Sequence, residues 1–311
     1  MSDSSQAVKL TLDKIINRAS RIILGKEQTL RLALTCILAR GHLLIEDLPG
    51  VGKTTLAHVL ARTLGLDFQR IQFTSDLLPS DISGASIYLR DSGEFKFRPG
   101  PIFSQMLLAD EINRATPKTQ SALLEAMEEQ QVTIEGESHP LPSPFFVIAT
   151  QNPAHQIGTF ALPESQLDRF MMRVSMGYPD RQAERALLKG RERRDLLHNL
   201  EPCLESKALR TMQARVPTIH VSDALLDYLQ DILQLSRQSS HYKTGLSPRA
   251  GLAILRSAQS WAMLEGRNHV IPEDIQMVLP SVAAHRLHGI DEQAQPSIET
   301  LLEPLHCVAI P

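Results

Sequence analysis

The sequence has little of what marks a secreted, zinc-binding or membrane-spanning protein. Its 3 cysteines, Cys36, Cys203 and Cys307, are too few and too widely spaced for a disulfide framework or a C-x-x-C zinc site. No run approaches the roughly 18 apolar residues of a membrane-spanning helix, and the first residues have neither the basic stretch nor the apolar core of a secretory signal. We therefore expect a cytoplasmic protein with reduced thiols and no membrane span.

An excess of one charge is lacking as well. The 32 Lys and Arg residues nearly balance the 35 Asp and Glu residues, which gives a formal net charge of -3. This balance provides no sequence-wide attraction to nucleic acid or to anionic lipid, so obligate DNA binding is not expected. The length of 311 residues suggests about two domains, and the 42% of hydrophobic residues can form a sizeable core.

The first half of the chain alternates strand-like and helix-like stretches, which is the arrangement of a parallel sheet with crossover helices. Two β-hairpins are predicted between the strands: one over residues 86–98 with a turn at Ser92-Gly93, and one that begins with residues 131–135 and turns near Gly136. Apolar runs predict five sheet strands, at residues 42–45, 68–73, 106–109, 145–149 and 171–176.

Beyond residue 180, apolar positions recur at helical spacing up to about residue 288, and Ser222, Ser247 and Pro272 are typical of helix starts. We therefore predict an α/β domain over residues 1–180 and a helical domain with a C-terminal tail over residues 181–311. Nothing in the pattern indicates whether the tail after Asp291 packs against the rest of the chain.

A glycine-rich loop separates the strand at residues 42–45 from a helical pattern. Its glycines let successive backbone N–H groups point toward one anion, and Lys53 adds a positive charge there. The helix that follows presents its N-terminal dipole to the same point, and the Thr54 hydroxyl is suited to Mg²⁺. The loop, which we predict to bind nucleotide phosphates, reads Pro49-Gly50-Val51-Gly52-Lys53-Thr54-Thr55.

This loop departs from the full eight-position phosphate-binding pattern at one residue. Asp47 stands where the pattern has its first glycine, so we expect an additional carboxylate near the phosphates and leave the geometry of the loop open. A simpler interpretation, a glycine turn with a solvated Lys53, is disfavoured by the strand, turn and helix context.

Polar side chains follow two more of the predicted strands. Asp110 and Glu111 come after the run at residues 106–109, and Asn152 comes after the run at residues 145–149. Because successive strand residues point to opposite sides, Asp110 can hold a water of the Mg²⁺ shell while Glu111 orients the water that attacks a γ-phosphate. The Asn152 amide, at an edge where open parallel sheets bind ligands, can report the nucleotide state. Taken singly, these residues also fit a solvated strand end and an Asn-Pro turn.

The order of these motifs resembles that of the MoxR-type AAA+ ATPases of the helix-2-insert group. Both predicted hairpins fall where this family has its helix-2 insert and its pre-sensor-1 hairpin. The resemblance covers nearly the whole chain and implies a P-loop NTPase sheet with flanking helices, followed by an all-α lid domain. The matching residues are the loop at 49–54 (Walker A), Asp110-Glu111 (Walker B), Asn152 (sensor 1), Leu167-Asp168-Arg169-Phe170 (arginine finger) and residues 245–250 (sensor 2).

The resemblance also implies roles that spacing alone does not give. Arg169 would enter the nucleotide site of a neighbouring subunit, so hydrolysis would need a homo-oligomeric ring, which we expect to be a hexamer. Arg249 would act as sensor 2 and couple the nucleotide to the lid. Leu24 and Gly25, which we place before the first long helix, would pack against adenine. Without the family, Arg169 fits a surface ion pair with Asp168, Arg249 a solvated first-turn arginine and Leu24-Gly25 an apolar turn.

The function implied by the resemblance is ATP hydrolysis with Mg²⁺, coupled to remodelling, assembly or metal loading of a protein client. A protein with a von Willebrand factor A domain would act as its partner. Three alternatives stay open: a small-molecule phosphotransferase, a nucleic-acid-directed AAA+ motor, which the acidic balance disfavours, and a nucleotide switch without turnover. In the first hairpin, Tyr88, Phe95 and Phe97 would either grip a client or pack the hairpin against its own domain.

Overall fold

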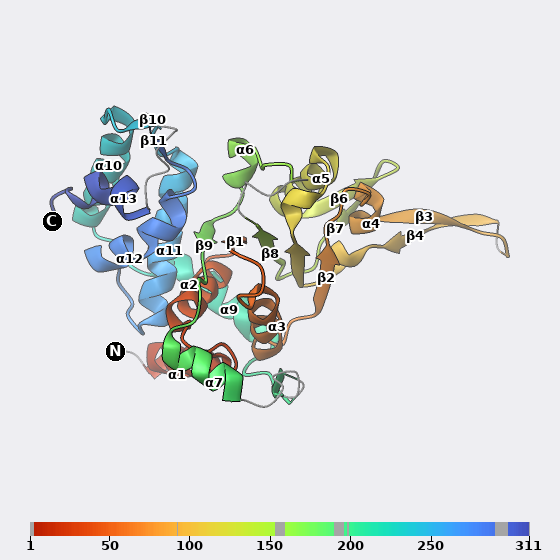
Figure 1. Ribbon diagram of the computed structural model, residues 1–311, viewed down its shortest axis with the longest axis horizontal. Helices are drawn as coiled ribbons and strands as arrows, with labels where there is room; N and C mark the ends of the chain where they lie inside the picture. The colour runs from red at the N-terminus through yellow and green to blue at the C-terminus, as the bar shows by residue number, and fades with distance from the viewer. Residues whose placement is uncertain are drawn as a thin grey trace.

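The computed structural model describes residues 3–91, 93–152, 159–189, 196–197, 199–289 and 298–310. An α/β part contains a five-stranded sheet, and a helical part follows it in the chain and packs beside it (Figure 1). One two-stranded hairpin projects from the α/β part as a long arm, on the side away from the helical part. The predicted fold class, a P-loop NTPase sheet with two inserted hairpins and a helical lid, is confirmed.

The sheet strands are all parallel and lie in the order β2-β5-β8-β1-β9. The chain leaves β1 in one direction toward β2 and later returns to add β9 on the other side, so the order reverses beside β1. Open α/β sheets bind ligands outside the carboxyl ends of the strands at such a reversal. All five predicted strands are confirmed, as β1 (Leu43–Glu46), β2 (Phe68–Gln72), β5 (Met106–Asp110), β8 (Phe146–Gln151) and β9 (Met172–Val174).

Alternation along the strands gives each face of the sheet its own core. Leu43 and Ile45 of β1 belong to the core on one face, whereas Leu44 belongs to the core on the other. The first face is covered by α1 (Asp3–Ser20), α2 (Glu27–Leu38) and α3 (Lys53–Thr63), and the second by α4 (Pro79–Ser83) and α5 (Pro117–Glu129). Three short turns of helix connect these elements: η1 (Pro101–Phe103), η2 (Ile112–Arg114) and α6 (Glu164–Leu167).

Both predicted hairpins are confirmed, although Ser92, at the predicted tip of the first, lies outside the described residues. Their aromatic side chains divide between the two interpretations. Phe97 stacks on His139 with ring centroids 4.2 Å apart and so joins the bases of the two hairpins, whereas Tyr88 and Phe95 are 52% and 71% exposed. The first hairpin pairs β3 (Gly84–Leu89) with β4 (Glu94–Pro99), and the second pairs β6 (Gln131–Ile134) with β7 (Glu137–Pro140).

In the helical part, the predicted helix starts at Ser222, Ser247 and Pro272 agree with the structure, and the domain boundary at residue 180 stays a prediction. An antiparallel pair of short strands, β10 (Tyr242–Thr244) with β11 (His288–Gly289), was not expected in an all-α lid. The helices are α7 (Arg181–Lys189), α9 (Ser206–Arg215), η3 (Val216–Thr218), α10 (Asp223–Gln238), α11 (Pro248–Leu264), α12 (Pro272–Ala283) and α13 (Ile298–His306).

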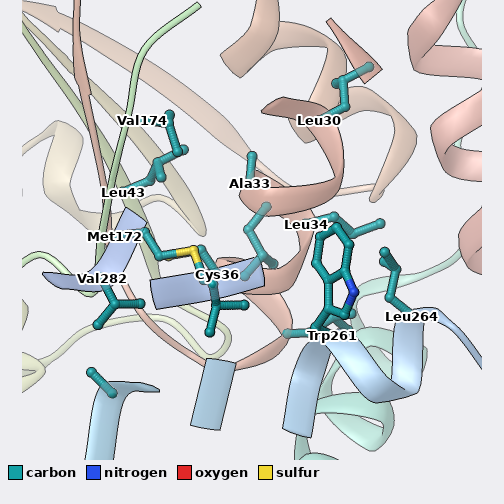
Figure 2. Close-up of a cluster of buried hydrophobic side chains, with 14 of the residues drawn as sticks. Leu30, Ala33, Leu34, Cys36, Leu43, Met172, Val174, Trp261, Leu264 and Val282 are labelled. Carbon is teal, nitrogen blue, oxygen red and sulfur yellow. The ribbon is translucent and has the colours of Figure 1, made fainter. Parts of the chain in front are cut away.

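Helix α2 joins the two parts, because it lies between the sheet and the helical part. Leu30, Ala33 and Leu34 on α2 share one buried cluster with Met172 of β9 and Trp261 of α11 (Figure 2). The α/β and helical parts therefore bury a continuous apolar core.

The structure corrects the predicted position of one turn and answers whether the C-terminal tail packs. The turn at Leu24-Gly25 does not precede the first long helix, because α1, with 18 residues, comes before it and buries Leu12 and Ile15. The tail does pack: Leu302 and Leu305 of α13 are fully buried and belong to the same core as α2. Every helix within the described ranges is too short or too polar to cross a membrane.

Candidate nucleotide site

The loop after β1 has the backbone of a phosphate-binding loop. Gly50 and Gly52 have φ angles of 84° and 99°, in the left-handed region that glycine adopts without strain. A Cβ atom added at Gly50 would meet nothing within 4 Å, so there is open space beside the backbone. Helix α3 begins at Lys53, directly after the loop, and its first N–H groups are available to an anion.

Three predicted site residues form one chain of hydrogen bonds. Lys53 Nζ donates to the Asp47 carbonyl oxygen at 2.6 Å and to Asn152 Oδ1 at 3.2 Å. Asn152 Nδ2 in turn donates to Glu111 Oε1 at 3.1 Å. Burial lowers the pKa of Lys53, although the negative charges of Asp47 and other nearby carboxylates oppose this shift. Lys53 at the start of α3 thus contacts Asn152 after β8, which in turn contacts Glu111 after β5.

Asp110 lies at the end of β5 and is buried, with both carboxylate oxygens in hydrogen bonds. Thr54 Oγ1 is 3.3 Å from Asp110 Oδ2, and Thr150 Oγ1 donates to Oδ1 at 2.6 Å. Arg70 also donates to Oδ2, from two nitrogens at 3.1 and 2.8 Å. A hydroxyl next to a carboxylate suits Mg²⁺, which takes oxygen ligands and keeps several waters. Among the described residues, no group of three or more His, Cys, Asp or Glu side chains could hold a metal.

Glu111 has a backbone conformation that few residues of its size adopt. Its φ and ψ of 57° and 49° lie in the left-handed region, where a non-glycine residue costs about 1–3 kcal/mol. Two partners of its carboxylate were not predicted: Gln72 Nε2 donates to Oε2 at 2.8 Å and Arg114 Nε lies 2.9 Å from the same atom. Arg70 and Gln72 alternate along β2, so their period of two was a signal for a polar face directed at Asp110 and Glu111.

A pocket with a volume of about 450 Å³ opens beside the loop, a size suited to the rest of a nucleotide. Leu24 lines this pocket together with Tyr178, and its packing against adenine stays a prediction. Gly25 is not among the lining residues; with φ of 67° it shapes the turn, where an added Cβ would lie 3.1 Å from Ala183 Cβ. The loop contributes Pro49, Gly50, Val51, Gly52 and Thr55 to the lining.

The Asp47 carboxylate, which the sequence leads us to expect near the phosphates, is engaged in four hydrogen bonds. Oδ2 accepts hydrogen bonds from Ser175 Oγ at 2.8 Å, Met176 N at 2.6 Å and Gly177 N at 2.5 Å, and Oδ1 accepts from Leu48 N at 2.8 Å. Burial alone would raise the pKa of Asp47, but these hydrogen bonds outweigh it and hold the pKa below its usual range. The carboxylate is therefore committed to the segment that follows β9.

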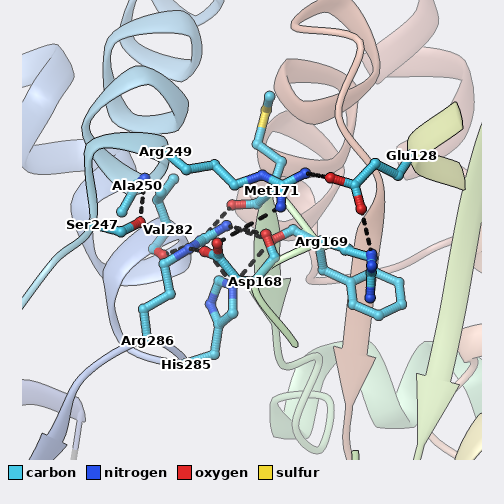
Figure 3. A network of polar contacts seen from close by, with 11 residues as sticks. Glu128, Asp168, Arg169, Met171, Ser247, Arg249, Ala250, Val282, His285 and Arg286 are labelled. Carbon is cyan, nitrogen blue, oxygen red and sulfur yellow. Dashed lines mark hydrogen bonds and ion pairs between the residues drawn. The ribbon is translucent and has the colours of Figure 1, made fainter. Parts of the chain in front are cut away.

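Arg169 and Arg249 lie at the other edge of the sheet and share one carboxylate. Arg169 Nε donates to Glu128 Oε2 at 2.7 Å, and an Arg249 guanidinium nitrogen donates to Glu128 Oε1 at 2.8 Å (Figure 3). The hydrogen bond from Arg169 is the main reason that the pKa of Glu128 is lowered. Glu128 was not predicted, and no motif marks it. The surface ion pair expected of Arg169 exists, but its partner is Glu128, whereas Asp168 binds Arg286 at 2.6 Å.

The pocket around these two arginines carries an excess of positive charge. Its lining includes Glu128 and Asp168 as the acidic residues and five arginines: Arg40, Arg169, Arg249, Arg256 and Arg286. The sequence does not predict this group, because its members come from segments before β1, around α6, and on α11 and beyond α12. A surplus of guanidinium groups around an open pocket suits an anion supplied from outside.

The two sites lie at opposite ends of the same strands. Leu43 of β1 pairs with Met172 of β9, and both strands run from the arginine pocket toward the phosphate loop. Arg169 precedes β9, whereas the loop follows β1. Arg169 and Arg249 are therefore on the amino edge of the sheet, away from the loop of their own chain.

Comparison with known proteins gives this arrangement a family. Residues 42–172 match the family described as "ATPase family associated with various cellular activities (AAA)", and residues 234–305 match the "AAA lid domain". The chain is 46% identical over 276 residues to the uncharacterized protein YeaC of Bacillus subtilis (strain 168), which covers 89% of this chain and 86% of YeaC. It is 39% identical over 315 residues to Chaperone MoxR1 of Mycobacterium tuberculosis, covering 97% and 82% of the two chains.

A solved structure extends the likeness to three dimensions. The crystal structure of a Cytophaga hutchinsonii protein assigned to the ATPases superposes with a TM-score of 0.90 at 34% identity, and the match covers 99% of this chain and 97% of that one. The chain belongs to the MoxR family of AAA+ ATPases. As an AAA+ ATPase it is a nucleotide-binding protein, and its nucleotide is ATP.

Proposed function

We propose that this AAA+ ATPase works as a ring, a hexamer, in which each ATP is hydrolysed between two subunits with the help of Mg²⁺. The observation that carries the proposal is the separation of the two sites: the phosphate loop lies at the carboxyl edge of the sheet and Arg169 with Arg249 at the amino edge. Since neither arginine lines the pocket beside its own loop, a neighbouring subunit is the natural place for them to act.

Within one subunit, the chain Lys53–Asn152–Glu111 provides the hydrolytic chemistry. Lys53 binds the β- and γ-phosphates, and Glu111 takes a proton from the attacking water as it orients it. Asn152 touches both residues and so can link the position of Glu111 to the presence of a γ-phosphate near Lys53. This pairing of a water-activating carboxylate with a phosphate loop favours hydrolysis over transfer to a small-molecule acceptor.

Thr54 and Asp110 are the residues that would hold Mg²⁺, Thr54 directly and Asp110 through a water. Their oxygens are 3.3 Å apart, and the absence of a larger acidic cluster among the described residues suits an ion that takes its other ligands from water and phosphate. Bound there, Mg²⁺ would neutralise phosphate charge as the transition state forms.

The arginine pocket would complete the site of the next subunit. When a γ-phosphate enters it, Arg169 and Arg249 can exchange Glu128 for phosphate oxygens, which a guanidinium also binds with two parallel hydrogen bonds. Arg249 would then act in trans rather than on the nucleotide of its own subunit. Its position on α11 would let the helical part of one subunit respond to ATP in the next.

ATP energy would be used to remodel, assemble or metal-load a protein client, with a von Willebrand factor A-domain protein as partner. Similarity to a protein named as a chaperone supports a client of protein nature. The projecting β3–β4 hairpin supports a contact site, because Tyr88 and Phe95 are exposed on it and lie 5.2 Å apart between ring centroids. The cytoplasmic location stays a prediction.

The test is ATP turnover per subunit against protein concentration, with the assembly mass measured by light scattering in the same samples. A trans arginine predicts that turnover per subunit rises as rings form and needs no added acceptor or nucleic acid. Full turnover by monomers would contradict the shared site. Turnover that depends on an added small-molecule acceptor, or on DNA, would favour the phosphotransferase or the nucleic-acid motor instead.

A further inference from the structure

We propose that Asp47 is a positioning residue for the base and ribose of the nucleotide, because its carboxylate fixes the segment Ser175–Gly177, and with it Tyr178, against the phosphate loop. The inference rests on the nucleotide site proposed above and assigns a task to the residue at which the loop departs from the usual glycine.

The backbone gives no reason for a glycine at this position. Asp47 is not among the described non-glycine residues that have a positive φ, so its backbone conformation does not require glycine. Its N–H instead donates to the Gln151 carbonyl at 3.3 Å and continues the pairing of β1 with β8. A side chain therefore fits here without backbone strain, and the carboxylate is available to accept hydrogen bonds.

The four donors around the carboxylate show what that use is. Three of them, Ser175 Oγ, Met176 N and Gly177 N, belong to the segment after β9, and all lie within 2.8 Å of Oδ2. Hydrogen bonds to an ionised acceptor are among the strong ones. The same aspartate is covalently attached to the phosphate loop, so it ties one wall of the pocket to the other.

The segment held by Asp47 leads directly to the base side of the pocket. Tyr178 lines that pocket with 72% of its surface exposed, and Met176 lines it from the same segment. On the far side, Lys26 Nζ donates to the Tyr178 carbonyl at 2.6 Å. Tyr178 is thus held between Lys26 and the Asp47 segment, in a position to pack against a base.

A substitution at Asp47 separates this task from phosphate binding. Lys53 Nζ is held by the carbonyl oxygen of Asp47, which every amino acid has. Loss of the carboxylate therefore leaves the contact that orients Lys53. It removes the tie to residues 175–177 and one hydrogen bond within the loop, from Leu48 N. The expected defect is one of base and ribose binding with nearly intact binding of the phosphate chain.

Isothermal titration calorimetry of the full chain with ADP and with inorganic tripolyphosphate separates binding of the whole nucleotide from binding of the phosphate chain alone. For Asp47→Ala we expect about tenfold weaker ADP binding and less than about threefold weaker tripolyphosphate binding, together with a smaller preference for ADP over GDP. Asp47→Asn keeps one acceptor oxygen and should fall between Asp47→Ala and the wild type. Ser175→Ala should weaken ADP binding in the wild type but cause no further loss in Asp47→Ala.

Asp274→Ala is the matched control, since Asp274 is also a buried carboxylate that accepts from a backbone N–H but does not line the pocket. It should lower stability without changing the ratio of ADP to tripolyphosphate affinity. Equal losses of both ligands in Asp47→Ala, or unchanged ADP binding, would overturn the inference. If Asp47→Ala does not fold, the same ratio in Asp47→Asn and Ser175→Ala decides. Wild-type protein that binds no ADP would overturn the nucleotide site and this inference with it.

Discussion

The two edges of the sheet are built in different ways. At the carboxyl edge, the polar side chains satisfy one another: Lys53 binds Asn152, Asn152 binds Glu111, and Asp110 is held by Thr54 and Thr150. At the amino edge, Arg169 and Arg249 share the carboxylate of Glu128, and Arg249 also lies 3.9 Å from the Asp168 carboxylate, which binds Arg286. The carboxyl edge is a prearranged site, whereas the amino edge is a set of cations with too few anions.

This difference in hydrogen bonding indicates what each edge needs from a ligand. A prearranged set of groups can bind and hydrolyse a ligand with little reorganisation, which is the requirement for electrostatic catalysis. A surplus of guanidinium groups gains most from a phosphate that arrives from elsewhere. The two edges are therefore complementary, and in the proposed ring the complement of each edge would lie on a second copy of the chain.

Of the substitutions considered, removal of the Arg169 side chain from the amino edge should have the largest effect on ATP turnover. Arg169→Ala should retain ATP binding, because the loop is untouched, yet lose about 10³-fold or more in turnover, or roughly 4 kcal/mol of transition-state stabilisation. The measurement is steady-state phosphate release at saturating ATP, with nucleotide affinity determined separately. Arg256→Ala, in the same pocket but not on Glu128, serves as the control for lost positive charge. A similar loss in both variants would contradict a specific finger.

Two substitutions at the carboxyl edge should cause different defects, one in ATP turnover and one in nucleotide affinity. Glu111→Gln should keep ATP bound and reduce turnover about 10²- to 10⁴-fold, because the water-activating carboxylate is lost. Lys53→Ala should lose nucleotide affinity, because the positive charge in the loop is gone. Fluorescent-nucleotide binding and phosphate release, measured on the same preparations, distinguish the two defects. Normal hydrolysis by Glu111→Gln, free of contaminating ATPase, would refute the assignment of Glu111.

As the pH falls, the free energy of unfolding should decrease first through a histidine at the amino edge and only later through an aspartate at the carboxyl edge. Burial lowers the pKa of His42, at the amino end of β1, from 6.5 to about 4. Below pH 6.5 the unfolded chain binds a proton that the folded chain does not, so stability falls with pH by up to roughly 3 kcal/mol by pH 4. Asp47 has a pKa below its usual range, so its contribution persists above the ordinary carboxyl value and is lost only in stronger acid.

Urea unfolding between pH 7 and pH 4 tests this order, with His42→Asn as the comparison. The asparagine keeps an acceptor near the Val147 N–H, which lies 3.0 Å from His42 Nδ1, but does not titrate. Its stability should depend less steeply on pH than that of the wild type. His285, whose pKa burial also lowers, is present in both chains and cancels. Equal slopes would show that His42 is not the group responsible.

The smallest effect is expected outside both edges. Replacing Tyr88 and Phe95 with serine should leave basal ATP turnover within about threefold, under 1 kcal/mol, because neither side chain lines the pocket at either site. Client remodelling or client-stimulated turnover should be lost. Phe97→Ser is a useful contrast, since it breaks the stack on His139 inside the protein. Normal client remodelling by the double variant would move the contact site elsewhere.

The sequence predicted the carboxyl edge better than the amino edge for a physical reason. Lys53, Asp110, Glu111 and Asn152 each follow an apolar strand, and the carboxyl ends of parallel strands meet at one edge. Glu128 has no such signal: it lies in the last turn of α5, and its importance comes only from the arginines that the fold places beside it.

Asp47 shows a second limit of the same kind. Its position in the loop suggested a carboxylate near phosphate, but three of its four donors are about 130 residues further along the chain, directly after β9. Only the pairing of β9 with β1 brings them together. Strand ends can be read from local patterns, whereas contacts between them depend on the order of strands in the sheet.

The most direct test of the shared site is a mixture of Arg169→Ala and Lys53→Ala subunits. Each variant alone should be nearly inactive. In a mixed ring, an intact loop on an Arg169→Ala subunit can meet an intact Arg169 on a Lys53→Ala neighbour, so mixing should restore part of the ATP turnover. If native mass spectrometry confirms mixed rings and no mixing ratio restores turnover, then Arg169 does not act on the nucleotide of its neighbour.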